Sequence, residues 1–195
     1  DNNGNATSGY LPSLGKYYLL EEASSTGYYV DNTKYYFDVT LDNLNPSVNV
    51  YEEIIKSKIK ITKLDNENNS CLAQGDATLQ GAKYGIYNSK NELVDNVVIG
   101  NDCTATSKDL PYGKYTIKEL ESSEGYYIDS NSYEIHITNN NIVNVTSKEQ
   151  VIKTKIKVTK LDSENKTCTA QGQAKLDGAK YGIYNSKNEL VDNVV

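Results

Sequence analysis

Hydrophobic and polar residues alternate along two related stretches, and this alternation predicts β-strands. In KIKITKLD, the side chains of Ile59, Ile61 and Lys63 would share one strand face, because successive side chains point to opposite faces. The related stretch KIKVTKLD places Lys160 on the corresponding apolar face. The sequence therefore directs a lysine toward an apolar core twice.

Similar short strands are predicted throughout the middle of the chain, between turns rich in Asn, Gly and Ser such as NSKNE and TNNNI. Helical periodicity is not evident in any long window. Seven strands in about 97 residues predict an all-β fold, a β-sandwich. The predicted strands are Ile59–Leu64, Tyr84–Asn88, Leu93–Val98, Lys114–Glu119, Tyr126–Ile128, Ser132–Thr138 and Ile142–Ser147.

An internal repeat organises the chain. Residues 62–98 recur as residues 159–195 with 7 differences in 37 positions, and the last 18 positions are identical. A weaker match joins the stretch that begins at Leu11 to the one that begins at Leu110. This pattern is expected of a window on a long array of repeats held end to end. We expect three parts: 1–55, the C-terminal part of one repeat; 56–153, a complete repeat; and 154–195, the N-terminal part of the next.

The inward lysine needs a partner, because burying an unpaired ammonium is costly unless it loses its proton or reacts. In YTIKEL, the side chains of Tyr115, Ile117 and Glu119 share one face of a predicted strand. In YYLLEE, Glu21 takes the corresponding place. Each repeat thus offers one inward lysine and one inward glutamate.

These residues resemble the Cna B-type domain, also called the SpaA-like pilin domain, of Gram-positive surface proteins. The resemblance rests on ITKLD, GAKYGIYNSKNE and LPYGKYTIKELESSEGYYID, and it covers the entire repeat. It implies tandem Ig-like (prealbumin-like) β-sandwich domains of about seven strands. It also implies an intramolecular isopeptide bond from Lys63 to an Asn or Asp of the last strand, promoted by an acidic residue that matches Glu119.

The last strand departs from that family pattern. Where the family has an Asn, this chain has Glu149, and the preceding repeat has Glu52. Asn144 is close in sequence, but it lies on the face opposite the valines of that strand unless a bulge shifts the register. Two alternatives stay open: a covalent bond, or a buried ionic cluster of Lys63 with Glu119 and Glu149.

The three cysteines are explained by the repeat. Cys71 and Cys103 lie in the complete repeat, which predicts a disulfide between them and an oxidising, extracellular location. Cys168 matches Cys71, and its expected partner falls near position 200.

Composition and charge narrow the function further. The net charge of −6 argues against a nucleic-acid backbone or an anionic membrane surface as a partner. No cofactor or metal is expected: DNENNS lacks the central Gly and terminal Glu of a calcium loop, and His136 lies on a polar strand face. No nucleophile has a His partner in the sequence, so an enzyme is not predicted beyond self-directed isopeptide formation.

The resulting hypothesis is a structural repeat of an extracellular stalk, adhesin shaft or pilus-like filament attached to a Gram-positive cell wall. Its expected partners are neighbouring repeats or copies of itself, end to end. The loop NSKNELVDN is unchanged between the copies, whereas a ligand-binding loop is expected to vary. The alternative is an adhesive module that binds a host or matrix protein through a tyrosine-rich edge containing Tyr28, Tyr29, Tyr35 and Tyr36.

Overall fold

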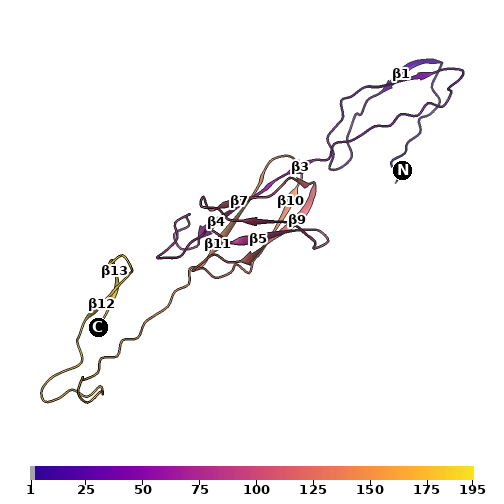
Figure 1. Ribbon diagram of the computed structural model, residues 1–195. Helices are drawn as coiled ribbons and strands as arrows, with labels where there is room; N and C mark the ends of the chain where they lie inside the picture. Colours follow the sequence, from indigo (N-terminus) through magenta and orange to yellow (C-terminus); the bar gives the residue numbers. More distant parts are fainter. Residues whose placement is uncertain (1–2) are drawn as a thin grey trace.

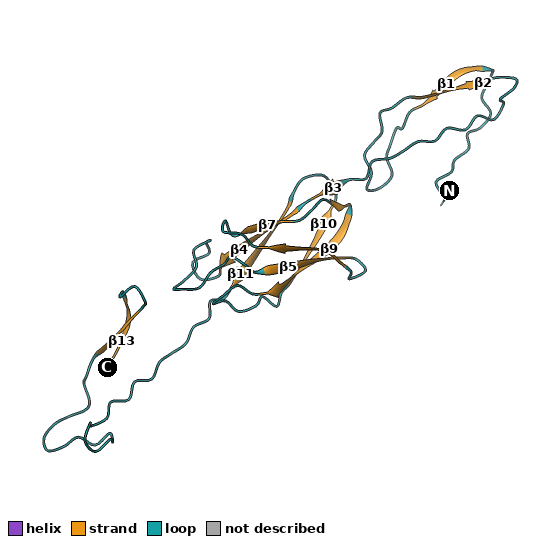
Figure 2. Ribbon diagram, in the orientation of Figure 1, coloured by secondary structure: helices purple, strands orange, loops and turns teal. Residues whose placement is uncertain are grey.

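The computed structural model describes residues 3–195, and within that range it consists of strands and loops without a helix (Figures 1 and 2). The same range accordingly contains no helical segment that could span a membrane. The strands are β1 (Gly15–Leu19), β2 (Tyr35–Val39), β3 (Lys56–Ser57), β4 (Ile59–Asp65), β5 (Lys83–Asn88), β6 (Leu93–Val98), β7 (Thr104–Thr106), β8 (Leu110–Pro111), β9 (Gly113–Glu121), β10 (Ser132–Ile137), β11 (Val143–Glu149), β12 (Tyr181–Tyr184) and β13 (Leu190–Val194).

Two sheets in the middle of the chain form a sandwich (Figure 1). One sheet has the strand order β10-β9-β5-β6, and the other has the order β11-β4-β7. All neighbouring strands in these sheets are antiparallel except β11 and β4, which run parallel. The apolar core between the sheets is built by residues of both, including Ile59, Ile61, Tyr84, Ile86, Ile117 and Val145.

Strand β4 follows the predicted alternation along its whole length. Ile59, Ile61, Lys63 and Asp65 are all buried, and the residues between them are only half-buried. Pairing with β11 places Ser147 opposite Lys63 in the parallel register. The first strand of the repeat therefore carries two charged side chains on its buried face.

One predicted strand is wrong. Residues 126–128 join no sheet, and Tyr126 forms only an isolated bridge with Val151. The reason lies in the backbone hydrogen bonds: Tyr126 N–H donates to the carbonyl of Ser123 in a turn, and Tyr127 N–H donates to the carbonyl of Gln150. These residues therefore bond to a turn and to the segment that follows β11, and not to a sheet. The sequence also missed the short strand β7, which pairs with β4.

The flanking segments extend from opposite ends of the sandwich, with the β1–β2 pair on the N-terminal side and the β12–β13 pair on the C-terminal side (Figure 1). Among the described residues before position 56 and after position 153, Val39 is the only buried hydrophobic side chain. Among the described residues, the well-packed hydrophobic clusters therefore lie in the central sandwich. The division into tandem domains stays a prediction.

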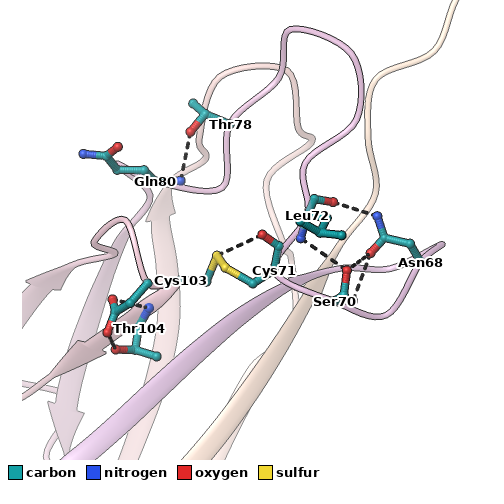
Figure 3. The surroundings of a disulfide bond; sticks show 9 residues. Asn68, Ser70, Cys71, Leu72, Thr78, Gln80, Cys103 and Thr104 are labelled. Carbon is teal, nitrogen blue, oxygen red and sulfur yellow. Dashed lines mark hydrogen bonds between the residues drawn. A yellow bond between two sulfur atoms is a disulfide. The ribbon is translucent and has the colours of Figure 1, made fainter.

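A disulfide joins Cys71 and Cys103, as the sequence predicts (Figure 3). Their Cα atoms are 5.9 Å apart, and the bond ties the loop after β4 to the turn before β7. The turn places Cys103 in the left-handed region with φ of 58°, and its side chain packs in a small cluster with Leu79, Tyr126 and Val151. Cys168 is a free, exposed thiol.

Removal of the disulfide should destabilise the sandwich. The bond spans 32 residues, and the chain-entropy account assigns such a loop about 3 to 4 kcal/mol. In a Cys168→Ser background, we expect the Cys71→Ser and Cys103→Ser double variant to unfold at correspondingly lower denaturant concentration. Equal midpoints for the two proteins, or three reactive thiols in the folded parent chain, would contradict this.

Candidate functional site

The candidate site centres on Lys63, whose direction is set by the alternation of β4. Its side chain is fully buried, and its Nζ donates a hydrogen bond of 3.0 Å to Oε1 of Glu119. Nζ also lies 3.3 Å from Oε2 of Glu149. Because β9 supplies Glu119 and β11 supplies Glu149, one ammonium contacts both sheets.

Glu119 lies near the end of β9, on the face that it shares with Tyr115 and Ile117. Its Oε2 accepts a hydrogen bond of 2.5 Å from the backbone N–H of Asp129. Burial raises the pKa of Glu119 to about 7, and the nearby Glu149 carboxylate adds to this, whereas the Asp129 N–H and Lys63 oppose it. The carboxyl group can therefore hold or release a proton near neutral pH.

Glu149 closes the cluster at the end of β11. Its Oε1 accepts a hydrogen bond of 2.9 Å from the Tyr84 hydroxyl and lies 2.8 Å from the hydroxyl of Ser147. Burial raises the pKa of Tyr84, so this phenol stays protonated and donates. In contrast, Oε2 has no hydrogen-bond partner among residues 3–195, although it is the atom that faces Lys63. One carboxylate oxygen is thus held in place and the other is directed at the amine.

A second layer of polar groups holds the two glutamates. The Ser147 hydroxyl lies 3.0 Å from Oδ2 of Asp129, which also accepts a hydrogen bond of 2.5 Å from the Tyr133 hydroxyl. Burial alone would raise the pKa of Asp129, but these donors and the Asn131 N–H outweigh it, so its pKa lies below the usual value. Asp129 therefore stays ionised and orients its neighbours.

Sequence reasoning missed a further buried carboxylate, Asp65. It accepts hydrogen bonds from the Tyr126 hydroxyl at 2.8 Å, from the Gln74 amide, and from two backbone N–H groups of the following turn. Burial opposes its ionisation, but these hydrogen bonds lower the pKa of Asp65. The sequence could have revealed it, because Asp65 lies two residues after Lys63 and so on the same face of the strand. Tyr84, Asp129 and Ser147 were also missed.

Three sequence-predicted residues lie away from this cluster. Asn144 is exposed, because β11 buries its odd-numbered residues, and its amide contacts only the carbonyl of Ile142; its assignment to the cluster was wrong. Lys160, which the sequence predicts as the inward lysine of the next repeat, is exposed in the C-terminal segment. Glu21 lies in the N-terminal segment, where it accepts a hydrogen bond of 2.6 Å from Asp31 N–H.

Comparison with known proteins identifies the family of the sandwich. Residues 57–151 match the SpaA family, described as a prealbumin-like fold domain. The sandwich is a SpaA domain. The match begins within β3 and ends at Val151, so it contains Lys63, both glutamates and the disulfide.

Two relatives differ in how much of the chain they cover. The trypsin-resistant surface T6 protein of Streptococcus pyogenes serotype M6 is 40% identical over 57 residues, which is 29% of this chain and 11% of that protein. The structure of the Bacillus anthracis TIE protein has a TM-score of 0.68 and 26% identity, over 92% of this chain and 32% of that one. The chain thus spans one third or less of the length of either protein.

The T6 backbone pilin of serotype M6 S. pyogenes also appears among the similar structures. It is 29% identical over 49% of this chain and 20% of its own, with a TM-score of 0.37. No group of His, Cys, Asp and Glu side chains in residues 3–195 has an arrangement that could hold a metal ion.

Removing the amine of Lys63 should destabilise the SpaA domain. We expect Lys63→Met to lower the free energy of unfolding by about 3 to 5 kcal/mol, because two buried carboxylates lose their cation. Lys60→Met is the matched control, since Lys60 lies on the outer face of β4. Denaturant unfolding measures both. Similar losses in the two variants would contradict the assigned role of Lys63.

The raised pKa of Glu119 also predicts a pH dependence. The folded state binds this proton more tightly than the unfolded chain, whose Glu titrates near 4.5, so stability should fall as the pH rises from about 4.5 to about 7. The lowered pKa values of Asp65 and Asp129 act below about pH 3.8, outside this window. Thermal unfolding should show a flatter profile for Glu119→Gln. A parent profile that rises across the window would refute this.

Proposed function

We propose that the chain is a structural module of an extracellular stalk, adhesin shaft or pilus-like filament on a Gram-positive cell surface. The observation that carries this proposal is the fully buried Lys63 held between carboxylates of both sheets in a SpaA domain. The buried polar side chains of the domain bond to one another and so join its own strands. Enzymatic turnover is not proposed, since the matching family is structural.

The names of the relatives support this role and location. One relative is a trypsin-resistant surface protein and another is a backbone pilin. A rigid, protease-resistant domain suits a part that projects from a cell. The partners proposed are neighbouring repeats or copies of the chain, end to end, without nucleic acid or membrane contact by this segment.

Tandem domains, with the boundaries 1–55, 56–153 and 154–195, form part of this proposal. Both flanking segments reproduce contacts of the SpaA domain. The bridge between Tyr28 and Ile54 matches the bridge between Tyr126 and Val151, and Asp162 caps its turn through the same backbone N–H groups as Asp65. Each flanking segment therefore carries local structure of the repeat but only part of its strands.

An isopeptide bond between Lys63 and Glu149 is the finer proposal. Neutral Lys63 Nζ attacks Cδ of protonated Glu149, the new C–N bond replaces a C–O bond, and one water leaves with Oε2. Glu119, which can hold a proton near neutral pH, accepts one from the amine and returns one to the leaving oxygen. The Tyr84 hydroxyl polarises the other oxygen, Oε1.

The alternative function is binding of a host or matrix protein. Its support is the exposure of three tyrosines of the predicted edge, Tyr28, Tyr29 and Tyr36, the last of which is 73% exposed. Tyr35 does not contribute, because it is half-buried and donates a hydrogen bond to Asp31. A solid-phase assay with matrix proteins separates this function from the structural one, which predicts no saturable binding.

Mass spectrometry tests the covalent bond. After reduction of the disulfide, we expect the intact chain to be lighter than its sequence mass by one water, and a digest to contain a branched peptide joining Lys63 to Glu149. Glu149→Gln should lose one ammonia instead, and Lys63→Ala should lose nothing at this site. A full sequence mass for the parent chain rejects the isopeptide bond and leaves the buried ionic cluster.

Limited trypsin digestion tests the structural role itself. We expect a fragment close to residues 57–151 to survive, because the flanking segments expose most of their side chains. The same fragment should be degraded faster in Lys63→Met than in Lys60→Met. Digestion of the whole chain at one uniform rate would argue against a resistant structural module.

A further inference from the structure

Lys63 faces two carboxyl groups, and its distances to them do not decide which one it would join. Nζ lies 3.0 Å from Oε1 of Glu119 and 3.3 Å from Oε2 of Glu149, and both glutamate side chains are fully buried. An amine attacks a protonated carboxyl more readily than a carboxylate, because the negative charge of the carboxylate opposes the attack. The product of the proposed isopeptide reaction therefore depends on which glutamate holds a proton.

Glu119 is contacted by groups that only donate. Its Oε1 accepts a hydrogen bond from Lys63 Nζ, and its Oε2 accepts one of 2.5 Å from Asp129 N–H. A backbone N–H has no lone pair with which to accept a proton from a carboxyl group. Burial raises the pKa of Glu119 to about 7, and these two donors oppose the rise. Both oxygens of Glu119 thus have contacts that favour the carboxylate.

Glu149 is contacted by hydroxyl groups, which can accept as well as donate. Its Oε1 lies 2.9 Å from the Tyr84 hydroxyl and 2.8 Å from the Ser147 hydroxyl. Ser147 is fully buried and lies opposite Lys63 in the pairing of β11 with β4. The same serine hydroxyl lies 3.0 Å from Oδ2 of Asp129. One serine oxygen is thus within hydrogen-bond distance of two carboxyl oxygens.

Two hydrogen bonds through Ser147 need two protons, and the serine supplies only one. Asp129 is held as a carboxylate, because its Oδ2 also accepts from the Tyr133 hydroxyl and its Oδ1 accepts from two N–H groups of Asn131. Burial would raise the pKa of Asp129, but these donors lower it. The serine proton therefore goes to Asp129. The second proton belongs on Oε1 of Glu149, which donates it to the serine oxygen.

We propose that Ser147, held by Asp129, keeps a proton on Oε1 of Glu149 and so selects Glu149 over Glu119 as the carboxyl that joins Lys63. Ser147 is in this sense a positioning residue of the reaction. The inference rests on the proposed isopeptide bond and names what directs that bond to one of two available carboxyl groups.

The same contacts account for every proton of the reaction. Counted from the ammonium, Lys63 keeps one proton in the amide, and Glu119 carries the other two in turn to Oε2 of Glu149, the first transfer making the amine neutral. The C–N bond forms, the C–Oε2 bond breaks, and Oε2 leaves as water. The proton of Oε1 passes to Ser147, whose own proton passes to Asp129, so Oε1 becomes the amide carbonyl. Asp129 is half-buried and can release this proton to solvent.

The rate of bond formation tests the role of Ser147. Cell-free synthesis of the 195-residue chain, stopped at intervals and followed by intact mass after reduction, measures this rate. We expect Ser147→Ala to slow the loss of water about 10-fold or more, and Ser147→Thr, which keeps the hydroxyl, to restore most of the rate. Asp129→Asn should also slow it, since an amide N–H in place of a carboxylate oxygen turns the serine proton toward Glu149. Ser107→Ala is the control, because Ser107 is also buried and its hydroxyl bonds to backbone groups.

A Glu149→Gln background separates proton positioning from packing. The glutamine amide has no carboxyl proton to hold, so Ser147→Ala should change the rate of ammonia loss less than about 2-fold in this background. A serine needed only for packing would slow both backgrounds alike, and that result would overturn the inference.

The remaining outcomes distinguish this inference from the isopeptide bond itself. A parent chain at full sequence mass rejects both. A bonded parent chain whose rate Ser147→Ala leaves unchanged, or whose digest joins Lys63 to Glu119, rejects the role of Ser147 alone. A trypsin-resistant fragment close to residues 57–151 verifies that each variant folds, and Asp129→Asn decides the question if Ser147→Ala does not.

Discussion

Burial of the Lys63 ammonium is the constraint on which the rest of this fold depends. Strand alternation fixes its direction, because Ile59 and Ile61 must face the core and Lys63 shares their parity. A fully buried ammonium needs opposite charges close to it. Glu119 supplies it from the opposite sheet and Glu149 from the neighbouring strand. The ion pairs alone add little net stability after desolvation, but loss of any member leaves a buried charge.

The cluster also specifies the register of the last strand. A shift of β11 by one residue would turn Glu149 outward and bring Lys148 toward Lys63, placing two like charges in the core. The observed parallel register therefore supplies a carboxylate to the buried ammonium, and a one-residue shift would not. The disulfide restrains a different part of the chain, the loop between Cys71 and Cys103. The two devices adjoin, because the backbone N–H of Lys63 donates a hydrogen bond to the carbonyl of Cys103.

Alternation and repetition were enough to predict the sandwich, the inward Lys63 with Glu119 near it, and the Cys71–Cys103 pair. They could not settle the third member of the cluster. Asn144 and Glu149 lie on opposite faces of one strand, and the choice depends on which parity β11 buries, a tertiary contact with β4. Residues 126–128 looked like a strand for a related reason. Their β-propensity is real, but their hydrogen bonds go to a turn and to the departing chain.

Backbone hydrogen bonds also form a joint at each end of the sandwich, where the chain enters and leaves it. Ile152 N–H donates to the carbonyl of Gly125 at one end, and Ile55 N–H donates to Gly27 at the other, so the same backbone contact closes both. The carbonyl of Ile55 then accepts from Tyr112 N–H, and the left-handed Gly27 lies so close to the Tyr112 ring that a Cβ would approach it at 3.0 Å. Backbone hydrogen bonds and a close glycine contact restrict the direction in which the chain leaves the sandwich, whereas a flexible linker does not. In the proposed stalk, such joints would fix the direction of one domain relative to the next.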